Sequence, residues 1–325
     1  MLTRQTPTIE RPPPAYEPPT LALGPAGAGN AAAQDQLAAS MAAEPQQQGL
    51  LDGFLDLIGY GPEDLARAKL EDQFVVSDEP VEGERAPNHL TEEEFQEVVE
   101  LYMAIEAGET DIVIDAEGSD LDPGEFREKV MADLARIMTT KAGRAMLKEL
   151  AYGTEDGKHF ETVIRDLGLD PAEAGTTAED GAGAVDGTGA DAVVSYVPGA
   201  DADLGFEVVP SDVALFHELV HAHHMVEGKI PGHVDPKTGA VKIEPPPLYT
   251  GEKDDLDPAA NAEEYATVGL CGRGGRYTEN GYREERAQVE GVKAKRRTSY
   301  LGTRADTDPY LRECHTREER AHPPK

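Results

Sequence analysis

Four histidines and one glutamate lie within the ten residues LFHELVHAHH, from Leu215 to His224. His217 and His221 are four residues apart and therefore share one face of a helix, about one turn apart. Both imidazoles can then reach one Zn²⁺ ion. Glu218 lies between them, where a carboxylate can take a proton from a water molecule. The spacing therefore predicts a zinc site for hydrolysis, with Glu218 as the general base.

The alternative is a helix that carries histidines on its surface. It is disfavoured because four of the nine histidines of the chain fall within these few residues. His224 shares the face of His217 but lies about 10 Å further along the axis, too far to bind the same ion. We expect His224 to be a neighbour of the site and His223 to be exposed.

The third metal ligand must come from elsewhere in the chain. The pattern H-E-x-x-H-x-x-G-x-x-H would require glycine at 224 and histidine at 227, where this sequence has His224 and Glu227. A carboxylate from a later helix is the other common solution. Glu244 and Glu252 lie in sequence rich in Pro, Gly and Asp, whereas NAEEYATVGL (261–270) is typical of a helix. One of its glutamates, Glu263 or Glu264, is the expected ligand, and the other would orient a histidine.

The elements that must position these residues follow from pattern and capping. Pro210-Ser211-Asp212 opens the helix with the histidines, and Gly228 closes it. A capping box, Thr91 with Glu94, begins a helix over 91–107. Residues 111–115 alternate like a strand, 123–151 contain helices, and the segments 192–199 and 205–210 are typical of strands. The Gly/Ala/Asp-rich segment 175–192 is expected to be a flexible surface loop.

Composition restricts the partners. The net charge of −33 argues against nucleic acid and anionic membranes, although residues 291–325 carry nine Lys/Arg against five Asp/Glu. No apolar run is long enough to span a membrane, and the N-terminus lacks the apolar core of a secretory signal. The protein is therefore expected in the cytoplasm, or secreted by a route without a classical signal peptide. Cys271 and Cys314 can pair, but two free thiols are expected.

Residues 1–50 are rich in Pro, Ala, Gly and Gln and are predicted to be disordered. They contain a P-P-x-Y motif, Pro13 to Tyr16, and a second copy spans Pro246 to Tyr249. Such motifs can dock on aromatic grooves such as those of WW domains. A chance match in a proline-rich chain is the simpler interpretation.

Five segments together resemble a known family. They are TTKAGRAMLKELAYG (139–153), VALFHELVHAHHMVEG (213–228), EEYATVG (263–269), YTENGYREE (277–285) and RRTSY (296–300). Their order is similar to that in the NleD-like effector metalloproteases of bacteria and, more distantly, in the light chains of botulinum and tetanus neurotoxins. The resemblance covers roughly residues 130–304. It implies a zinc endopeptidase that is delivered into target cells.

Matched position by position, the resemblance implies His217, His221 and Glu264 as ligands and Glu218 as the base. Glu263 would then hydrogen-bond to a ligand histidine. The R-x-x-Y pattern places Arg297 and Tyr300 at the oxyanion of the reaction, with Glu279 holding the arginine. Without the resemblance, Arg297 is simply one residue of the basic run from Lys293. The segment between His221 and Glu264 varies most in this family, so the substrate cannot be inferred.

We therefore predict an α+β fold, with a zincin-like metalloprotease domain at 111–305. A disordered region (1–50) and a helical region (51–110) precede it, and a polar tail (306–325) follows. The expected cofactor is Zn²⁺, and the expected partner is a protein substrate in a target cell. Three alternatives remain: an antibacterial toxin with an immunity partner, a protein that only binds the metal, and an adaptor that recruits WW-domain proteins. The intact Glu218 argues against the second.

Overall fold

The structure is a computed structural model that describes residues 61–78, 85–166, 168, 170–244, 261–271, 275–298 and 320. Several predictions concern residues outside these ranges. They include the disordered region 1–50, both P-P-x-Y motifs, Tyr300, Cys314 and, apart from residue 320, the tail 306–325.

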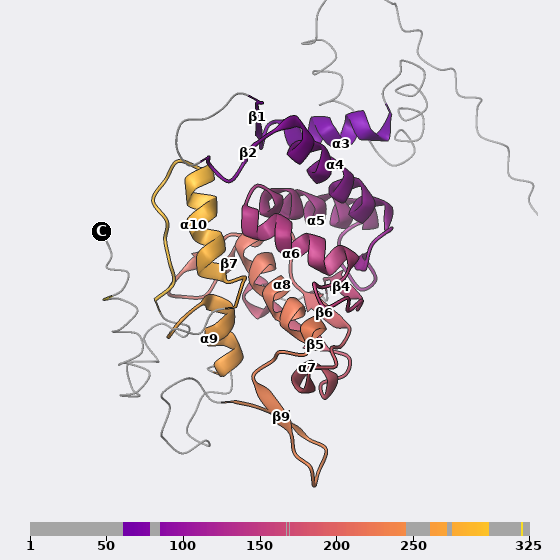
Figure 1. Cartoon of the computed structure of the whole chain (residues 1–325), viewed down its shortest axis with the longest axis vertical. Helices are drawn as coiled ribbons and strands as arrows, with labels where there is room; N and C mark the ends of the chain where they lie inside the picture. The colour runs from indigo at the N-terminus through magenta and orange to yellow at the C-terminus, as the bar shows by residue number, and fades with distance from the viewer. Residues whose placement is uncertain are drawn as a thin grey trace, which may run out of the picture. The chain divides into compact units, whose positions relative to one another are not determined.

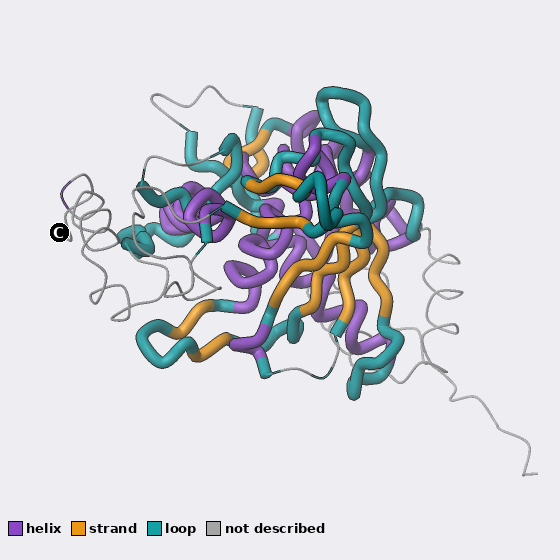
Figure 2. The backbone as a smooth tube through the Cα atoms, turned by 90° about the horizontal axis from the view of Figure 1, so that it is seen from below, coloured by secondary structure: helices purple, strands orange, loops and turns teal. Residues whose placement is uncertain are grey.

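A four-stranded mixed sheet lies beside the helices (Figures 1 and 2). Its order is β3 (Ile112–Asp115), β4 (Thr162–Arg165), β6 (Ala192–Ser195) and β5 (Gly175–Ala178). The first three strands are parallel, and β5 pairs antiparallel with β6 at the edge. Burial alternates along β3, as the sequence pattern predicts. With the helices, this sheet confirms the predicted α+β class.

The segment 175–192 is not a surface loop, so that prediction was wrong. It contains β5 and a short helix, α7 (Gly183–Asp186). Its small residues permit close approach of other backbone: a Cβ at Gly183 would lie 2.4 Å from the carbonyl oxygen of Gly189, and one at Gly189 would lie 2.3 Å from that of Val226. Here the glycines allow tight packing rather than flexibility.

Capping residues and glycines mark the ends of several helices. α4 (Glu92–Ala107) starts with the reciprocal hydrogen bonds of Thr91 and Glu94 and ends at Gly108 in the left-handed conformation. α5 (Pro123–Met138) and α6 (Lys141–Tyr152) occupy the predicted helical segment. Thr140 caps α6 by accepting a hydrogen bond from the N–H of Gly143. Shorter helices are α3 (Pro62–Glu71), α9 (Ala262–Val268) and α10 (Glu279–Val289), and η1 (Pro171–Glu173) is a 3₁₀ turn.

α8 (Ser211–Glu227) carries the histidines and is buried on nearly all sides. It contacts helices α5, α6, α7, α9 and α10 and strands β5 and β6. Near its N-terminus, Asp212 accepts hydrogen bonds from Tyr282 (2.6 Å) and Arg286 (2.7 Å) of α10. Gly228, with φ of 69°, ends it. Because α8 is enclosed, its polar side chains need partners within the protein.

Three pairs of short strands complete the described part. They are β1 (Val75–Val76) with β2 (His89–Leu90), β7 (Ala202–Asp203) with β8 (Val208–Val209), and β9 (Gly232–Val234) with β10 (Val241–Ile243). The strand predicted at 205–210 is thus confined to the two residues of β8. Cys271 is disulfide-bonded, so the expectation of two free thiols was wrong.

One continuous hydrophobic core includes residues from Ala66 to Tyr282. The core therefore includes residues on both sides of position 110, where the sequence predicted a domain boundary. That boundary remains a prediction.

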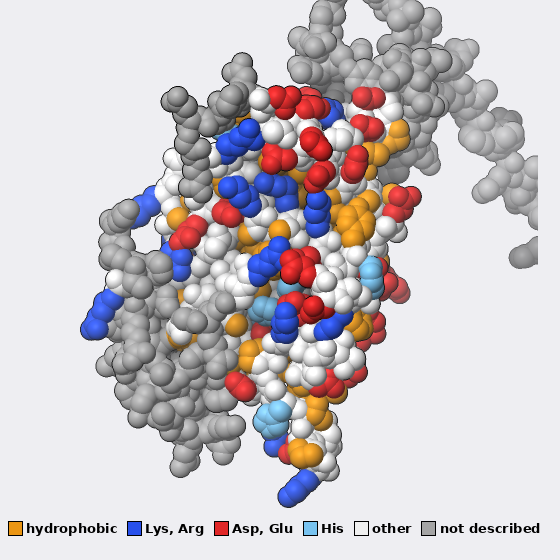
Figure 3. Space-filling model, in the orientation of Figure 1, with side chains coloured by type: hydrophobic (Ala, Val, Ile, Leu, Met, Phe, Trp, Pro, Cys, Tyr) orange, Lys and Arg blue, Asp and Glu red, His pale blue; other side chains and the backbone are white. Residues whose placement is uncertain are grey.

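Acidic side chains gather on the surface over α3 and α4 (Figure 3). Among the described helices, none combines the length and the apolar character that a bilayer crossing requires.

Candidate metal centre

His217 and His221 direct their outer ring nitrogens to one point. The two Nε2 atoms are 3.1 Å apart, and the rings meet edge to face. This arrangement follows from the four-residue spacing on α8, which stacks the side chains one turn apart. The structure therefore brings together the two residues that local spacing predicted as ligands.

Glu264 offers a third potential ligand atom from α9. Its Oε2 lies 3.3 Å from Nε2 of His217 and 3.2 Å from Nε2 of His221. Asn261 fixes the start of α9 by accepting hydrogen bonds from the N–H groups of Glu263 and Glu264. In the described part of the chain, these three residues form the group of His, Cys, Asp or Glu side chains able to hold a metal ion.

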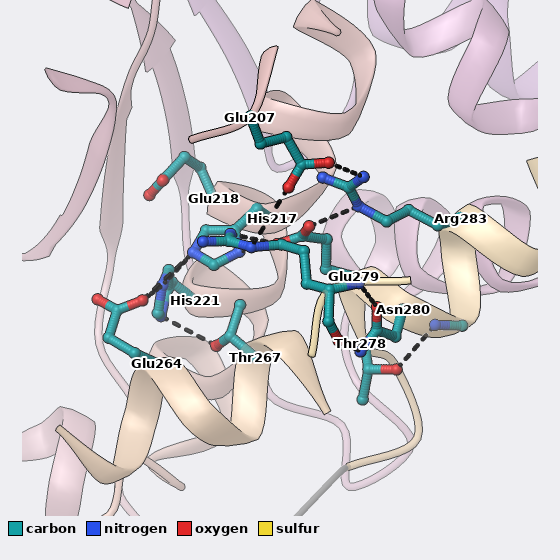
Figure 4. Close-up of polar contacts among 12 residues, drawn as sticks. Glu207, His217, Glu218, His221, Glu264, Thr267, Thr278, Glu279, Asn280 and Arg283 are labelled. Carbon is teal, nitrogen blue, oxygen red and sulfur yellow. Dashed lines mark hydrogen bonds and ion pairs between the residues drawn. The ribbon is translucent and has the colours of Figure 1, made fainter. Parts of the chain in front are cut away.

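The inner nitrogens of both histidines face carboxylates. Nδ1 of His217 lies 2.8 Å from Oε2 of Glu279 (Figure 4). Nδ1 of His221 lies 2.8 Å from Oε1 of Glu263. Because a carboxylate only accepts, each Nδ1 must donate its proton there. In the neutral rings, each Nε2 then presents a lone pair to the other and to the Glu264 carboxylate.

Converging lone pairs repel unless a cation lies among them, so these residues fit a metal ion. Zinc with ligands at about 2.0–2.2 Å in tetrahedral geometry would separate the ligand atoms by roughly 3.3–3.6 Å, close to the observed 3.1–3.3 Å. Without a metal ion, burial lowers the pKa of His217, but hydrogen bonds to Glu264 and Glu279 outweigh it and raise that pKa to about 9, so a proton on Nε2 then takes the position of the cation. The protein thus concentrates negative charge at this point. Two imidazoles and one carboxylate, with carboxylates behind the rings, are a donor set typical of Zn²⁺.

Glu218 lies next to the ligands on α8 and is held by β5. Its Oε2 accepts a hydrogen bond of 2.8 Å from Oγ1 of Thr176. The same hydroxyl also lies 3.0 Å from the backbone carbonyl oxygen of Glu218. Thr176 was not predicted, because it lies in the segment that was expected to be a loop.

Glu279 connects the first histidine to Arg297. Its Oε2, which faces His217, also accepts a hydrogen bond of 3.0 Å from Nη1 of Arg297. Arg297 is buried, although it ends a basic run. Its backbone is held by the Asn280 amide, which donates to its carbonyl and accepts from its N–H. The structure thus joins Arg297 and Glu279 to the histidines, whereas Tyr300 lies outside the described residues.

Two further charged residues support this cluster and were not predicted. Arg283 donates from Nε to Oε1 of Glu279 (2.6 Å) and from Nη1 to Oε1 of Glu207 (2.9 Å). Oε2 of Glu207 lies 4.0 Å from Nε of Arg297. The four-residue spacing of Glu279 and Arg283 on α10 is a signal that could have identified the arginine. Glu207 comes from the β7–β8 connection and has no comparable signal.

The remaining histidines of α8 have separate partners. Nδ1 of His224 lies 2.7 Å from the same Glu263 oxygen that faces His221, so His224 does neighbour the metal centre. The prediction that His223 is exposed was wrong, because it is only 4% exposed and its Nε2 lies 2.7 Å from Oε2 of Glu149. The enclosure of α8 on this face by α6 explains the error.

Comparisons with known proteins support the sequence resemblance. The peptidase M91 family, described as effector proteins, matches residues 110–290. The chain matches no curated protein.

Two solved structures are similar at 14% identity. The botulinum neurotoxin type D light chain has a TM-score of 0.33 and matches 65% of this chain and 66% of its own. The Clostridium botulinum neurotoxin serotype F light chain has a TM-score of 0.29, with coverages of 60% and 50%. The matched region thus spans less than two thirds of the first light chain and half of the second.

Proposed function

The chain belongs to the peptidase M91 family of effector proteins, and we propose that it is a zinc-dependent endopeptidase that cleaves a protein inside a target cell. The convergence of His217 Nε2, His221 Nε2 and Glu264 Oε2 within 3.3 Å, beside the carboxylate of Glu218, carries this proposal. A metal-binding protein without catalytic activity would not require the additional carboxylate.

His217, His221 and Glu264 would hold the ion, and Glu263 and Glu279 would fix the orientation of the two rings. When bound, Zn²⁺ polarises the scissile carbonyl and lowers the pKa of a water molecule. Glu218 takes the proton from the attacking water and passes it to the nitrogen of the leaving amine. The hydroxyl of Thr176 keeps the Glu218 carboxylate in one orientation for both transfers.

Arg297 stabilises the negative charge that develops on the carbonyl oxygen of the substrate. Its guanidinium lies near the metal centre because Glu279 binds both the arginine and His217. A preorganised cation in a buried site stabilises such a charge far more than one in water. Tyr300, which the R-x-x-Y pattern assigns to the same task, would add a hydrogen bond from its hydroxyl.

The family description supports delivery of the protein into another cell. We propose that residues 1–50 serve secretion or partner docking. A WW-domain partner for Pro13 to Tyr16 remains a prediction. A pull-down comparing the wild-type chain with Tyr16→Ala would test it, because that tyrosine defines the motif.

The proposed activity can be tested by identifying new protein N-termini in cells that express the wild-type chain or Glu218→Gln. The substitution is nearly isosteric but removes the base. We expect a small set of cleavages with the wild type and none of them with the variant. Identical sets of N-termini in both samples would contradict the proposal.

A further inference from the structure

A pocket opens beside the candidate base. It has a volume of about 290 Å³, and its polar lining residues, which form the polar border of the pocket, are His217, Glu218, Glu279 and Arg297. The other eight of its twelve lining residues are apolar, so more of its lining is apolar than polar. A pocket of this kind favours an apolar group.

The wall of this pocket comes from the β7–β8 hairpin, the segment around η1 and α8. Leu204 and Phe206 lie in the connection between the two strands, and Ala214 is on α8. Ala214 precedes Glu218 by four residues, so both occupy one face of the helix. A side chain in the pocket would therefore lie close to Glu218, which also lines it.

The size of the pocket fits a single side chain. An apolar cavity of about 150 Å³ holds a benzene molecule, whereas pockets for small-molecule ligands usually occupy roughly 300–1,000 Å³. A volume of about 290 Å³ accommodates a branched aliphatic or aromatic side chain with adjoining backbone. It exceeds what alanine or glycine would fill.

The charges at the border do not favour a charged occupant. Glu279 is buried and already faces His217, Arg283 and Arg297. Arg297 is paired with Glu279 and is reserved in the proposed reaction for the developing oxyanion, and Glu218 must stay available for proton transfer. A buried charge in the pocket would therefore have no uncommitted counterion among these described residues, and its desolvation would be costly.

Phe206 lines the pocket and is 47% exposed, which is unusual for so large an apolar side chain. Its ring also lies 5.9 Å from the guanidinium carbon of Arg297. A substrate side chain in the pocket would cover the ring and remove its apolar surface from water. This burial would favour binding next to the catalytic groups.

We propose that this pocket binds a branched aliphatic or aromatic side chain of the substrate residue next to the scissile bond, with Leu204 and Phe206 as specificity-determining residues. The inference rests on the proposed peptidase function and extends it to the class of substrate. The pocket would recognise one residue of the substrate. The other residues of the substrate would bind elsewhere on the protein.

The test uses the full-length, zinc-loaded chain and a peptide library prepared from a digested proteome. Mass spectrometry of the products gives the residues on both sides of each cleaved bond. We expect enrichment of large apolar residues at one of the two flanking positions. Matched peptides that differ only at this position, with Leu, Phe, Ala or Gly, then provide kcat/KM values.

Two variants change residues that line the pocket, and a third variant serves as a matched control. Phe206→Ala should lower kcat/KM about tenfold for the Leu and Phe peptides but less than threefold for the Gly peptide. Ala214→Leu reduces the pocket from the helix side and should shift the preference to smaller residues. Val208→Ala alters the same hairpin at a residue that is 55% exposed and does not line the pocket, and it should leave kcat/KM unchanged.

A binding measurement separates recognition from chemistry. The Glu218→Gln chain should bind the uncleaved Phe peptide more tightly than the Gly peptide, as measured by fluorescence anisotropy, and Phe206→Ala in that background should abolish the difference.

Cleavage with no apolar enrichment at either flanking position would overturn this inference and leave the proposed function standing. An equal loss for all peptides in Phe206→Ala would also overturn it, because the ring would then act through Arg297. If neither the library nor any cellular protein is cleaved, the proposed function fails and this inference fails with it.

Discussion

The side-chain amide of Asn280 binds the backbone of Arg297 at two points. Its Oδ1 accepts a hydrogen bond of 2.7 Å from the N–H, and its Nδ2 donates one of 2.9 Å to the carbonyl oxygen. The two residues are 17 apart in sequence, and both are buried. These two hydrogen bonds hold the segment after α10 close to the metal centre. They thereby place the guanidinium of Arg297 next to Glu279.

Replacing Asn280 with Ala should therefore misplace Arg297 without removing a metal ligand. We expect zinc content to stay at the wild-type level and kcat to fall at least about tenfold, because small displacements of catalytic groups are costly. The buried backbone groups that lose their partners should lower the free energy of unfolding by about 1–3 kcal/mol. Gln288→Ala, at an exposed position of α10, is the control. Wild-type kcat in Asn280→Ala would show that the two hydrogen bonds of Asn280 do not position Arg297 for catalysis.

The adjacent glutamates of α9 should differ in their effect on zinc. Glu264→Ala removes a ligand atom, whereas Glu263→Ala removes the partner of Nδ1 of His221. Loss of such a supporting partner typically weakens metal affinity about 10- to 100-fold, and loss of the ligand should weaken it more. Competition titration with a chelating dye measures both affinities. Equal zinc affinity in Glu264→Ala and the wild type would rule out the ligand assignment.

Thr176→Val tests the support of the base. Valine has nearly the same shape but cannot donate a hydrogen bond to Glu218. We expect kcat to fall about tenfold, equivalent to roughly 1.4 kcal/mol of transition-state stabilisation, with zinc affinity and KM nearly unchanged. Thr177→Val is the matched control, since this neighbour on β5 is exposed. A similar decrease in both variants would indicate a general effect on the strand.

Tyr300→Phe tests the assignment that rests on the R-x-x-Y pattern alone. Removal of one oxyanion donor should lower kcat about 10²–10³-fold, with little change in KM. Zinc content and thermal stability should remain those of the wild type. A wild-type rate would mean that the RTSY match is a coincidence within a basic run.

The parts of the site that depend on local spacing were predictable. His217, Glu218 and His221 lie within five residues on one helix, so the period of the helix determines their arrangement. Spacing alone left Glu263 and Glu264 open, and the family pattern favoured Glu264, the residue that the structure places against both histidines. Arg297 likewise required the resemblance.

Other contacts join residues distant in sequence and have no local signal. Thr176 reaches Glu218 across 42 positions, and Glu207 reaches Arg283 across 76. The burial of His223 depends on how many elements surround α8, which its own sequence does not reveal. The segment 175–192 was misassigned because a composition of Gly, Ala and Asp suits both a mobile loop and a tightly packed backbone.

The most direct test of the metal centre is a crystal structure of the purified full-length chain, with diffraction data collected on both sides of the zinc absorption edge. We expect one strong anomalous difference peak about 2.0–2.2 Å from His217 Nε2, His221 Nε2 and Glu264 Oε2. In Glu218→Gln the same peak should persist, since that residue is not a ligand. Absence of the peak after zinc supplementation, or a peak coordinated by Glu263 in place of Glu264, would contradict the proposed zinc site.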